Sequence, residues 1–216
     1  MSTGVFIAGR LKSERLPGKL LLPIGGSNLW DIACDKLSKL PGTYNKYVLA
    51  EDGELVKIAA GYPELKVIVR DKNTAITDSP LSYIFKDLAG LPDKYLMFLN
   101  PCQSFISIGT IVKSLRSFER SACQYATSVK CLQNWLFDES HSSMNEINYK
   151  NLSTKEIKPI WQAAHCFHIF NKDSFFQDGH MLKPGHLLLP VPENEAIDVD
   201  TYDDYLYARW RHEICD

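Results

Sequence analysis

The sequence alternates short apolar runs with segments of helical periodicity, and this alternation restricts the fold more than any other feature of the chain. Apolar or β-branched runs predict strands at residues 3–8, 46–50, 65–69, 95–99, 122–129 and 164–170. Helical patterns lie between and after them, at residues 28–40, 54–60, 79–88, 108–118 and 202–212. Strands that alternate with helices favour a mostly parallel sheet with helices on both faces. We therefore predict an α/β fold whose ligands bind beyond the carboxyl ends of the strands.

Two stretches interrupt the alternation. The polar stretch from Cys131 to Lys158 indicates a loop or an arm that grips a partner chain, and we bound this possible dimerisation excursion at residues 131–160. Residues 173–192 contain several prolines and are predicted to be irregular. The length of 216 residues suits a single domain over residues 1–216 better than two independent domains.

Composition narrows the classes of partner. The chain has 24 Lys and Arg against 26 Asp and Glu, a balance that does not favour nucleic acid or an anionic membrane. No apolar run approaches the roughly 20 residues of a membrane helix, and we expect no signal peptide at the N-terminus. The six cysteines lack C-x-x-C spacing, so we expect a reducing, cytoplasmic setting rather than a disulfide framework or a zinc site. Any anion site must therefore be local.

The loop after the first predicted strand, residues 9–26, concentrates positive charge on a glycine-bearing backbone. Its cations are Arg10, Lys12, Arg15 and Lys19. Phosphate sites use glycine for close backbone approach, N–H groups as donors, and Arg or Lys for charge. The P-loop and dinucleotide fingerprints are both absent. The loop therefore predicts either a phosphate site of another kind or a solvated basic turn.

A second motif lies near the end of the chain, where Asp198 and Asp200 are separated by one residue. In an extended segment the two carboxylates point to the same side, and they repel each other unless a cation lies between them. Mg²⁺ prefers one or two carboxylates together with phosphate oxygens and water. The alternative is a helix N-terminus, with Asp200 or Thr201 as its cap and Asp203 and Asp204 complementing the dipole. Both interpretations can hold together.

The pattern R-x-x-S-x-R-L-P-G-K, from Arg10 to Lys19, resembles the nucleotide-binding signature of the CMP-sugar synthetases. These are the cytidylyltransferases that activate 3-deoxy-manno-octulosonate and the sialic-type nonulosonates. The resemblance implies that the loop wraps the triphosphate of CTP, with Arg10 and Lys19 on phosphate oxygens and Ser13 and Arg15 in support. The family usually has proline-alanine where this chain has Ala8-Gly9, which we also expect to contact the nucleotide.

The closing motif is similar to the I-D-I-D-T-x-x-D segment of the sialic-type synthetases, in which the two aspartates bind the catalytic Mg²⁺. This resemblance assigns the metal to Asp198 and Asp200. Asp203 and Asp204 are expected to be structural.

The middle motifs resemble the family less. The turn after residue 99 is similar to the family's L-Q-x-T-S-P-L-R turn, which implies that Asn100 touches nucleotide and sugar and that Gln103 touches sugar. It lacks the metal-binding aspartate of the octulosonate branch, which favours the sialic-like branch. Arg70 and Asp78 correspond to residues near the base and ribose, although Asp78 is equally well explained as a helix cap.

The segment from Lys158 to Phe170 lies where the family usually has an asparagine-glycine that lines the sugar pocket. Gln162 and His165 are our candidate sugar contacts there. His168 lies three residues after His165, and on a regular strand the two side chains would point to opposite faces.

The resemblance implies a Rossmann-like fold of the nucleotide-diphospho-sugar transferase type and a Mg²⁺-dependent cytidylyltransferase that acts in polysaccharide biosynthesis. CTP and an acidic keto-sugar would give a CMP-sugar and pyrophosphate, with Arg10, Lys19 and Asp200 as catalytic residues. The family is usually dimeric, so a homodimer is expected. Two alternatives stay open: a nucleotidyltransferase for another nucleotide or sugar phosphate, and a catalytically idle relative that only binds nucleotide or sugar.

Overall fold

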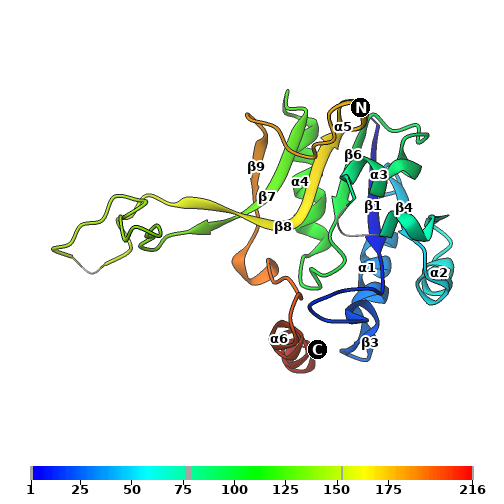
Figure 1. Ribbon diagram of the computed structural model, residues 1–216, viewed down its shortest axis with the longest axis horizontal. Coiled ribbons are helices and arrows are strands. Elements are labelled where there is room, and N and C mark those ends of the chain that lie inside the picture. The colour runs from blue at the N-terminus through cyan, green and yellow to red at the C-terminus, as the bar shows by residue number, and fades with distance from the viewer. Residues whose placement is uncertain (1, 76–78, 152, 216) are drawn as a thin grey trace.

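The computed structural model describes residues 2–75, 79–151 and 153–215, and its centre is a seven-stranded sheet (Figure 1). The spatial order of the strands is β5-β4-β1-β6-β8-β7-β9. Their bounds are β1 Thr3–Gly9, β4 Asn45–Ala50, β5 Lys66–Val69, β6 Tyr95–Leu99, β7 Tyr125–Leu132, β8 Ile160–Asn171 and β9 Leu187–Pro190. A small hairpin, β2 (Pro23–Ile24) and β3 (Ser27–Asn28), lies apart from the sheet.

Every neighbouring pair in the sheet is parallel except those that involve β8. This strand is antiparallel to both β6 and β7, whereas β9 returns parallel to β7 at the edge. The predicted mostly parallel α/β sheet is therefore confirmed.

Helices cover both faces of the sheet. Their bounds are α1 Leu29–Ser38, α2 Gly53–Ala60, α3 Leu81–Ile84, α4 Ile108–Glu119, α5 Lys172–Asp178 and α6 Tyr202–Cys215. Short 3₁₀ turns occupy Lys19–Leu21 (η1), Lys72–Ala75 (η2), Lys86–Leu88 (η3) and Glu193–Glu195 (η4). The buried residues of α1, α2 and α4 share one core with Val5 and Ile7 of β1, and Phe6 joins the opposite core with Phe175 of α5. β1 is thus apolar on both faces, as expected for a central parallel strand.

The switch in strand order lies between β1 and β6. From β1 the chain builds outward through β4 to β5, and it then crosses to β6 on the other side of β1. The connections that leave the carboxyl ends of β1 and β6 therefore diverge, which opens a crevice where doubly wound sheets bind ligands.

Two predictions about secondary structure were wrong. The helix predicted at 79–88 is split into α3 and η3, because Phe85 leaves helical geometry to pack against Phe6 and Phe98, with ring centroids 5.3 and 5.8 Å apart. The stretch 173–192, predicted to be irregular, contains most of α5 and all of β9. Asn171 caps α5, and Pro190 ends β9 at the sheet edge, where its missing N–H is tolerated.

β7 and β8 continue beyond the sheet as a twisted ribbon that projects far from the body of the molecule (Figure 1). The segment 133–159 joins them, and we call it the arm. It carries an isolated bridge between Phe137 and Ser143 and exposes the large side chains of Phe137, Met144 and Tyr149.

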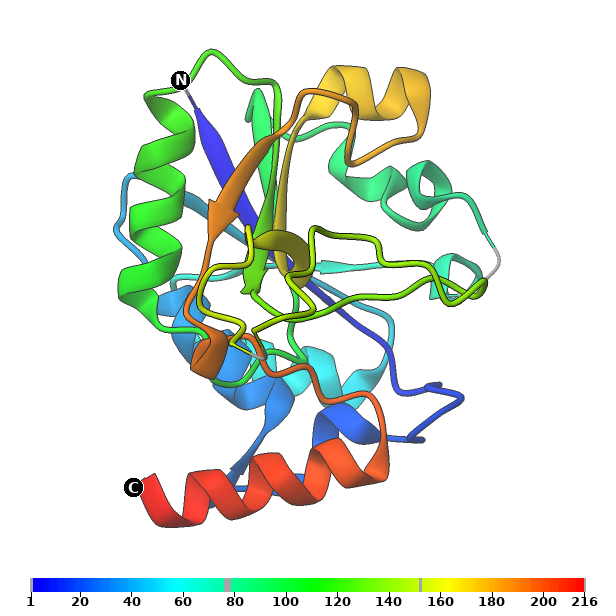
Figure 2. The same ribbon diagram turned by 90° about the vertical axis from the view of Figure 1, so that its left-hand side faces the viewer.

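The last helix, α6, lies across one end of the molecule (Figure 2, red). Tyr205 fixes it by donating a hydrogen bond to the carbonyl of Pro23, at 2.9 Å. Within the described ranges, no helix has both the length and the apolar character needed to cross a membrane.

Candidate active site

A cavity of about 400 Å³ opens at the crevice between β1 and β6. Its walls come from the loop after β1, the turn after β6 and the segment before α6. The lining residues are Ala8, Arg10, Ser13, Glu14, Arg15, Lys19, Leu20, Phe98, Asn100, Pro101, Cys102 and Asp200. Three segments that are far apart in the sequence therefore meet around one volume.

The loop after β1 is held in shape by its own backbone and by leucines. The carbonyl of Leu11 accepts hydrogen bonds from the N–H groups of Ser13 and Gly18, at 3.0 and 3.1 Å. Gly18 adopts a left-handed φ of 67°, a conformation that favours glycine, and it starts the 3₁₀ turn η1. Leu16 and Leu20 are buried in the main core. The cations are consequently presented on an anchored loop.

Gly9, at the start of this loop, is required by a close contact. A Cβ atom at this position would lie 2.5 Å from the ring of Trp30, which is fully buried and donates to the carbonyl of Leu55 at 2.9 Å. The departure from the family's usual proline-alanine at Ala8-Gly9 thus accompanies a tryptophan packed under the loop.

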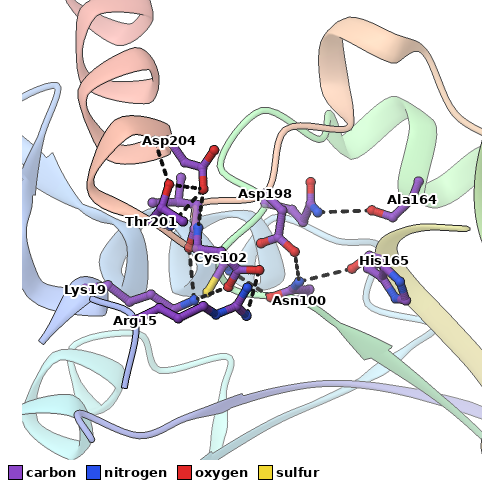
Figure 3. Close-up of polar contacts among 12 residues, drawn as sticks. Arg15, Lys19, Asn100, Cys102, Ala164, His165, Asp198, Thr201 and Asp204 are labelled. Atoms are coloured by element: carbon purple, nitrogen blue, oxygen red, sulfur yellow. Dashed lines mark hydrogen bonds and ion pairs between the residues drawn. The ribbon is translucent and has the colours of Figure 1, made fainter. Parts of the chain in front are cut away.

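The cations of the first loop lie beside the segment before α6: Figure 3 shows Arg15 and Lys19 pointing toward the stretch that carries Asp198 and Thr201. Both cations contact Asp200 in this stretch. Lys19 Nζ lies 2.7 Å from Asp200 Oδ1 and also donates to the carbonyl of Val199 at 2.9 Å. Arg15 Nη2 lies 2.9 Å from Asp200 Oδ2. Burial alone would lower the pKa of Lys19, but the neighbouring Cys102 and Asp200 outweigh burial and raise it. Lys19 is therefore a firmly charged ammonium group in the wall of the cavity.

Asp198 lies beside Asp200 in a different environment. Asn100 Nδ2 donates to Asp198 Oδ2 at 3.4 Å and to the carbonyl of His165 at 3.1 Å. Burial, followed by the charge of Asp200, raises the pKa of Asp198 to about 6, against the opposing influence of nearby cations. Its Oδ1 atom is buried and has no hydrogen-bond partner among the described residues. A carboxylate oxygen of this kind is suited to a metal ion.

The helix-cap interpretation of the closing motif also holds, with Thr201 rather than Asp200 as the capping residue and with Asp204 as its partner. Asp204 Oδ2 accepts from Thr201 N–H at 2.8 Å and from Asp200 N–H at 3.1 Å. Thr201 Oγ1 in turn accepts from Asp204 N–H at 3.2 Å. This reciprocal arrangement caps α6 and leaves the carboxylate of Asp200 to face the cations.

The turn after β6 and the segment before α6 are joined backbone to backbone. Val199 N–H donates to the carbonyl of Cys102 at 3.2 Å, and Asn100 Oδ1 accepts from Cys102 N–H at 3.0 Å. Asn100 therefore organises the turn and contacts Asp198 at the same time.

The structure brings six of the predicted nucleotide-site residues into the cavity wall: Ala8, Arg10, Ser13, Arg15, Lys19 and Asn100. Arg70 lies behind the wall, where it is buried, donates to the carbonyl of Gly9 at 2.9 Å and pairs with Glu51 at 3.3 Å. Arg70 therefore stabilises the start of the loop through the Gly9 carbonyl and does not line the cavity. Asp78 lies outside the described residues.

The predicted sugar contacts are more scattered. Gln103 is buried and donates to the carbonyl of Ala164 at 3.1 Å, so it ties the turn to β8. Gln162 is exposed on β8 opposite Lys130, on the ribbon that leads to the arm, and does not line the cavity. His165 is exposed next to the Asn100–Asp198 contact.

The expectation that His165 and His168 point to opposite faces was wrong. Their rings are in contact, with centroids 5.7 Å apart. The register of β7 against β8 slips between Thr127 and Val129, and His165 adopts a left-handed φ of 53°. This irregularity turns the strand between the two histidines. Burial, together with His165 and His186, lowers the pKa of His168 to about 4.

Several wall residues were not predicted from the sequence, among them Glu14, Phe98 and Cys102. Burial raises the pKa of the Cys102 thiol to about 11, so it is neutral at physiological pH. Its position two residues after Asn100 was a usable signal. Glu14 is the single acidic residue among the four cations of loop 9–26, and a negative charge does not predict a phosphate site.

No protein-family model matches the sequence, and no match was found among the curated proteins. Solved structures do match over the whole chain. CMP:2-keto-3-deoxy-manno-octonic acid synthetase, solved in complex with CTP, superposes with a TM-score of 0.72 at 14% identity and covers 100% of both chains. 4-Diphosphocytidyl-2C-methyl-D-erythritol synthase from Anaerococcus prevotii DSM 20548 gives a TM-score of 0.67 at 12% identity over 98% of both chains.

A cytidylyltransferase from Leptospira borgpetersenii serovar Hardjo-bovis is also similar, with a TM-score of 0.58 and 16% identity. The alignment covers 95% of this chain and 84% of that one. At these identities the likeness concerns the fold. The chain therefore has the α/β nucleotidyltransferase fold that these cytidylyltransferases share.

Proposed function

We propose that the protein is a cytidylyltransferase that activates an acidic keto-sugar, sialic-acid-like or related, with CTP. The observation that carries the proposal is the meeting of Arg10, Arg15 and Lys19 with Asp200 around one cavity at the switch point of the sheet. Asp198 lies next to this cavity, where it accepts a hydrogen bond from the wall residue Asn100. Cations for a triphosphate and carboxylates for its metal ion are thus supplied from opposite ends of the chain. The likeness to a synthetase solved with CTP supports the choice of nucleotide.

In the proposed reaction the anomeric hydroxyl oxygen of the sugar attacks the α-phosphorus of CTP. A new oxygen–phosphorus bond forms, the bond to the β-phosphate bridging oxygen breaks, and pyrophosphate leaves. Arg10 and Lys19 lie in the cavity wall, where they balance the charge that builds on the leaving pyrophosphate. The proton of the hydroxyl leaves to solvent or to a nearby base.

The residues present fit a divalent cation. Asp198 has a buried oxygen without a partner, and Asp200 lies close enough to raise the pKa of Asp198. Within the part of the chain that the structure describes, no three or more His, Cys, Asp or Glu side chains gather as a metal cage. Two carboxylates completed by phosphate oxygens and water are the arrangement that Mg²⁺ favours. When bound, Mg²⁺ would polarise the α-phosphate and lower the pKa of the attacking hydroxyl.

The second substrate is proposed to approach from the β8 side of the cavity. Asn100 and His165 lie there beside Asp198, and their amide and imidazole groups are suited to a polar, anionic sugar. Gln103 is proposed to act by holding the turn to β8, and Gln162 is the outermost candidate contact.

A nucleotidyltransferase for another nucleotide or a sugar phosphate is the second candidate. It is favoured by the fold shared with 4-diphosphocytidyl-2C-methyl-D-erythritol synthase. An idle nucleotide-binding relative is the third, since Cys102 and Ala164-His165 depart from the residues usual in the resembled family.

A pyrophosphate-release assay separates these candidates. The purified protein is incubated with Mg²⁺ and each of CTP, UTP, ATP and GTP, together with acidic keto-sugars in one arm and sugar or polyol phosphates in another. The lead proposal expects release only with CTP and only in the keto-sugar arm. Release with another nucleotide, or only in the phosphate arm, favours the second candidate. Calorimetric binding of CTP without release in any arm favours the idle relative.

We also propose that the chain forms a homodimer through the arm and works in the cytosol. Phe137, Met144 and Tyr149 are more than half exposed on the arm, at 51%, 64% and 72%, and a second chain would cover them. The free thiols among the described cysteines are compatible with a reducing compartment.

A further inference from the structure

We propose that Arg15 and Lys19 keep Asp200 ion-paired until a nucleoside triphosphate arrives, so that triphosphate and divalent cation bind to this site as a mutually dependent pair. Arg15 is in this view a nucleotide-binding residue that exchanges between Asp200 and a phosphate group. The inference rests on the proposed function for the identity of the nucleotide, but its metal arm can be tested without any nucleotide.

The carboxylate of Asp200 is engaged on both oxygens. Lys19 Nζ lies 2.7 Å from Oδ1, and Arg15 Nη2 lies 2.9 Å from Oδ2. A divalent ion at either oxygen would lie beside a fixed positive charge, which repels it. The metal must therefore compete with both cations as long as they remain in place.

Arg15 and Lys19 both line the cavity, so both can reach the phosphate oxygens of a bound triphosphate. They differ in freedom. Lys19 is 14% exposed and held by the carbonyl of Val199, whereas the side chain of Arg15 is 66% exposed. Arg15 can therefore leave Asp200 for a phosphate without disturbing packed side chains, and it is the partner that exchanges most readily.

Charge balance then couples the two ligands. A triphosphate that arrives alone draws the cations away and leaves Asp200 unpaired beside phosphate oxygens. A metal ion that arrives alone is repelled by the positive charges of Arg15 and Lys19. When the triphosphate and the metal ion are both bound, the metal ion lies between the Asp200 carboxylate and the phosphate oxygens. The cations and the metal ion then each have a negatively charged neighbour. Because linkage is reciprocal, each ligand must tighten the other by the same factor, for which about 5- to 150-fold is typical.

The test is an Arg15→Gln variant, whose affinity for Mn²⁺ alone should rise and whose affinity for CTP alone should fall. Mn²⁺ binding without nucleotide, measured by electron paramagnetic resonance, should become about two- to fivefold tighter. The reason is that the ion pair between Arg15 and Asp200 no longer competes with the metal. CTP binding in EDTA, followed by calorimetry, should become at least about fivefold weaker, since a phosphate contact is gone. A purely structural role of Arg15 would weaken both.

Two further variants act as controls. Arg209→Gln removes an exposed arginine that is ion-paired with Glu213 on α6 at 2.8 Å, and it should change neither affinity. Asp200→Asn, introduced into the wild-type protein and into the Arg15→Gln variant, should abolish the specific Mn²⁺ binding of both proteins. A tight Mn²⁺ signal that survives Asp200→Asn places the ion elsewhere and overturns the inference.

The outcomes separate this inference from the proposed function. If Arg15→Gln binds Mn²⁺ no more tightly than wild type, the inference is overturned whatever CTP does. If tripolyphosphate and Mn²⁺ tighten each other in the wild-type protein while CTP has no advantage over tripolyphosphate, the inference stands and the cytidylyltransferase proposal fails. If no triphosphate changes Mn²⁺ affinity, the coupling is absent and the inference is overturned.

Discussion

Single residues of this site act through the charges around them. Lys19 is nearly enclosed, and its ammonium group has the backbone of Val199 and the carboxylate of Asp200 as partners. Asp198 is partly buried, and burial opposes its ionisation. A nucleotide and a metal ion would satisfy charges that the protein by itself pairs only in part. The chemistry proposed for the site therefore depends on a few side chains whose removal has measurable consequences.

Lys19→Ala should lower kcat for pyrophosphate release at least about a hundredfold, or about 3 kcal/mol in transition-state stabilisation. The physical reason is the loss of a charge beside the leaving pyrophosphate. Lys12→Ala is the matched control, because Lys12 is an exposed cation on the same loop that does not line the cavity. Steady-state kinetics of both variants check the prediction, and near-wild-type turnover of Lys19→Ala would remove Lys19 from the mechanism.

His168 predicts a pH dependence of stability. Burial and two neighbouring histidines lower its pKa from 6.5 to about 4 in the folded protein. The unfolded chain therefore binds the proton more readily between these values, and stability should rise with pH from about 4 to 6.5 and be lost as pH falls through this window. Denaturant unfolding of His168→Gln between pH 4 and 7 should show a smaller slope than wild type.

The exposed His180 offers the matching control, since His180→Gln should keep the wild-type slope. Equal slopes for wild type and His168→Gln would show that His168 is not the group responsible.

At the scale of elements, the ribbon of β7 and β8 carries an irregularity next to the site. The register slips between Thr127 and Val129, and on the other strand His165 has a left-handed φ of 53°. The carbonyl of this same residue accepts from Asn100. The irregularity thus places a backbone acceptor and an imidazole beside Asp198, which a regular strand would not do. Backbone strain of this kind commonly accompanies functional sites.

A pair of variants at position 165 measures the strain. His165→Gly and His165→Ala both remove the imidazole, but only glycine accepts a positive φ without a steric cost. We expect His165→Gly to be more stable than His165→Ala by about 1 kcal/mol. Urea unfolding of the two proteins gives the difference directly. If alanine is equally stable, position 165 is not held in the left-handed region.

On the scale of the whole molecule, the arm is the segment that extends farthest from the body of the fold (Figure 1). It projects away from the sheet (Figure 1). Its side chains Phe137, Met144 and Tyr149 are more than half exposed in the single chain. A second copy that covers them would also bring the ribbon of β7 and β8 close to another molecule. Assembly and site geometry would then depend on the same pair of strands.

Replacing Phe137, Met144 and Tyr149 by serine should convert the proposed dimer to a monomer in sedimentation velocity, because the apolar contact area of the arm is lost. The control replaces Trp210 and Ile214 of α6 by serine, which are also exposed, at 56% and 62%. It should leave the oligomeric state unchanged. A wild-type protein that sediments as a monomer would contradict the prediction at once.

Much of this architecture can be read from local patterns. The apolar run of β1, the helical spacing of α1 and the position of α4 depend on residues that are neighbours in the sequence, so periodicity predicts them. The cationic loop and the aspartate pair were also visible, because their spacing is short. Patterns fail where distant packing decides, as at Phe85, whose aromatic neighbours end the helix predicted at 79–88.

The sequence by itself determined the α/β class and the residue types that face the cavity, since both follow from order and spacing along the chain. Tertiary structure alone decided which of them meet. It placed Lys19 against Asp200, put Arg70 behind the wall, and turned His165 toward His168. The physical reason is that these contacts join segments up to 181 positions apart, and their geometry depends on how the sheet twists and how β8 pairs rather than on any local preference.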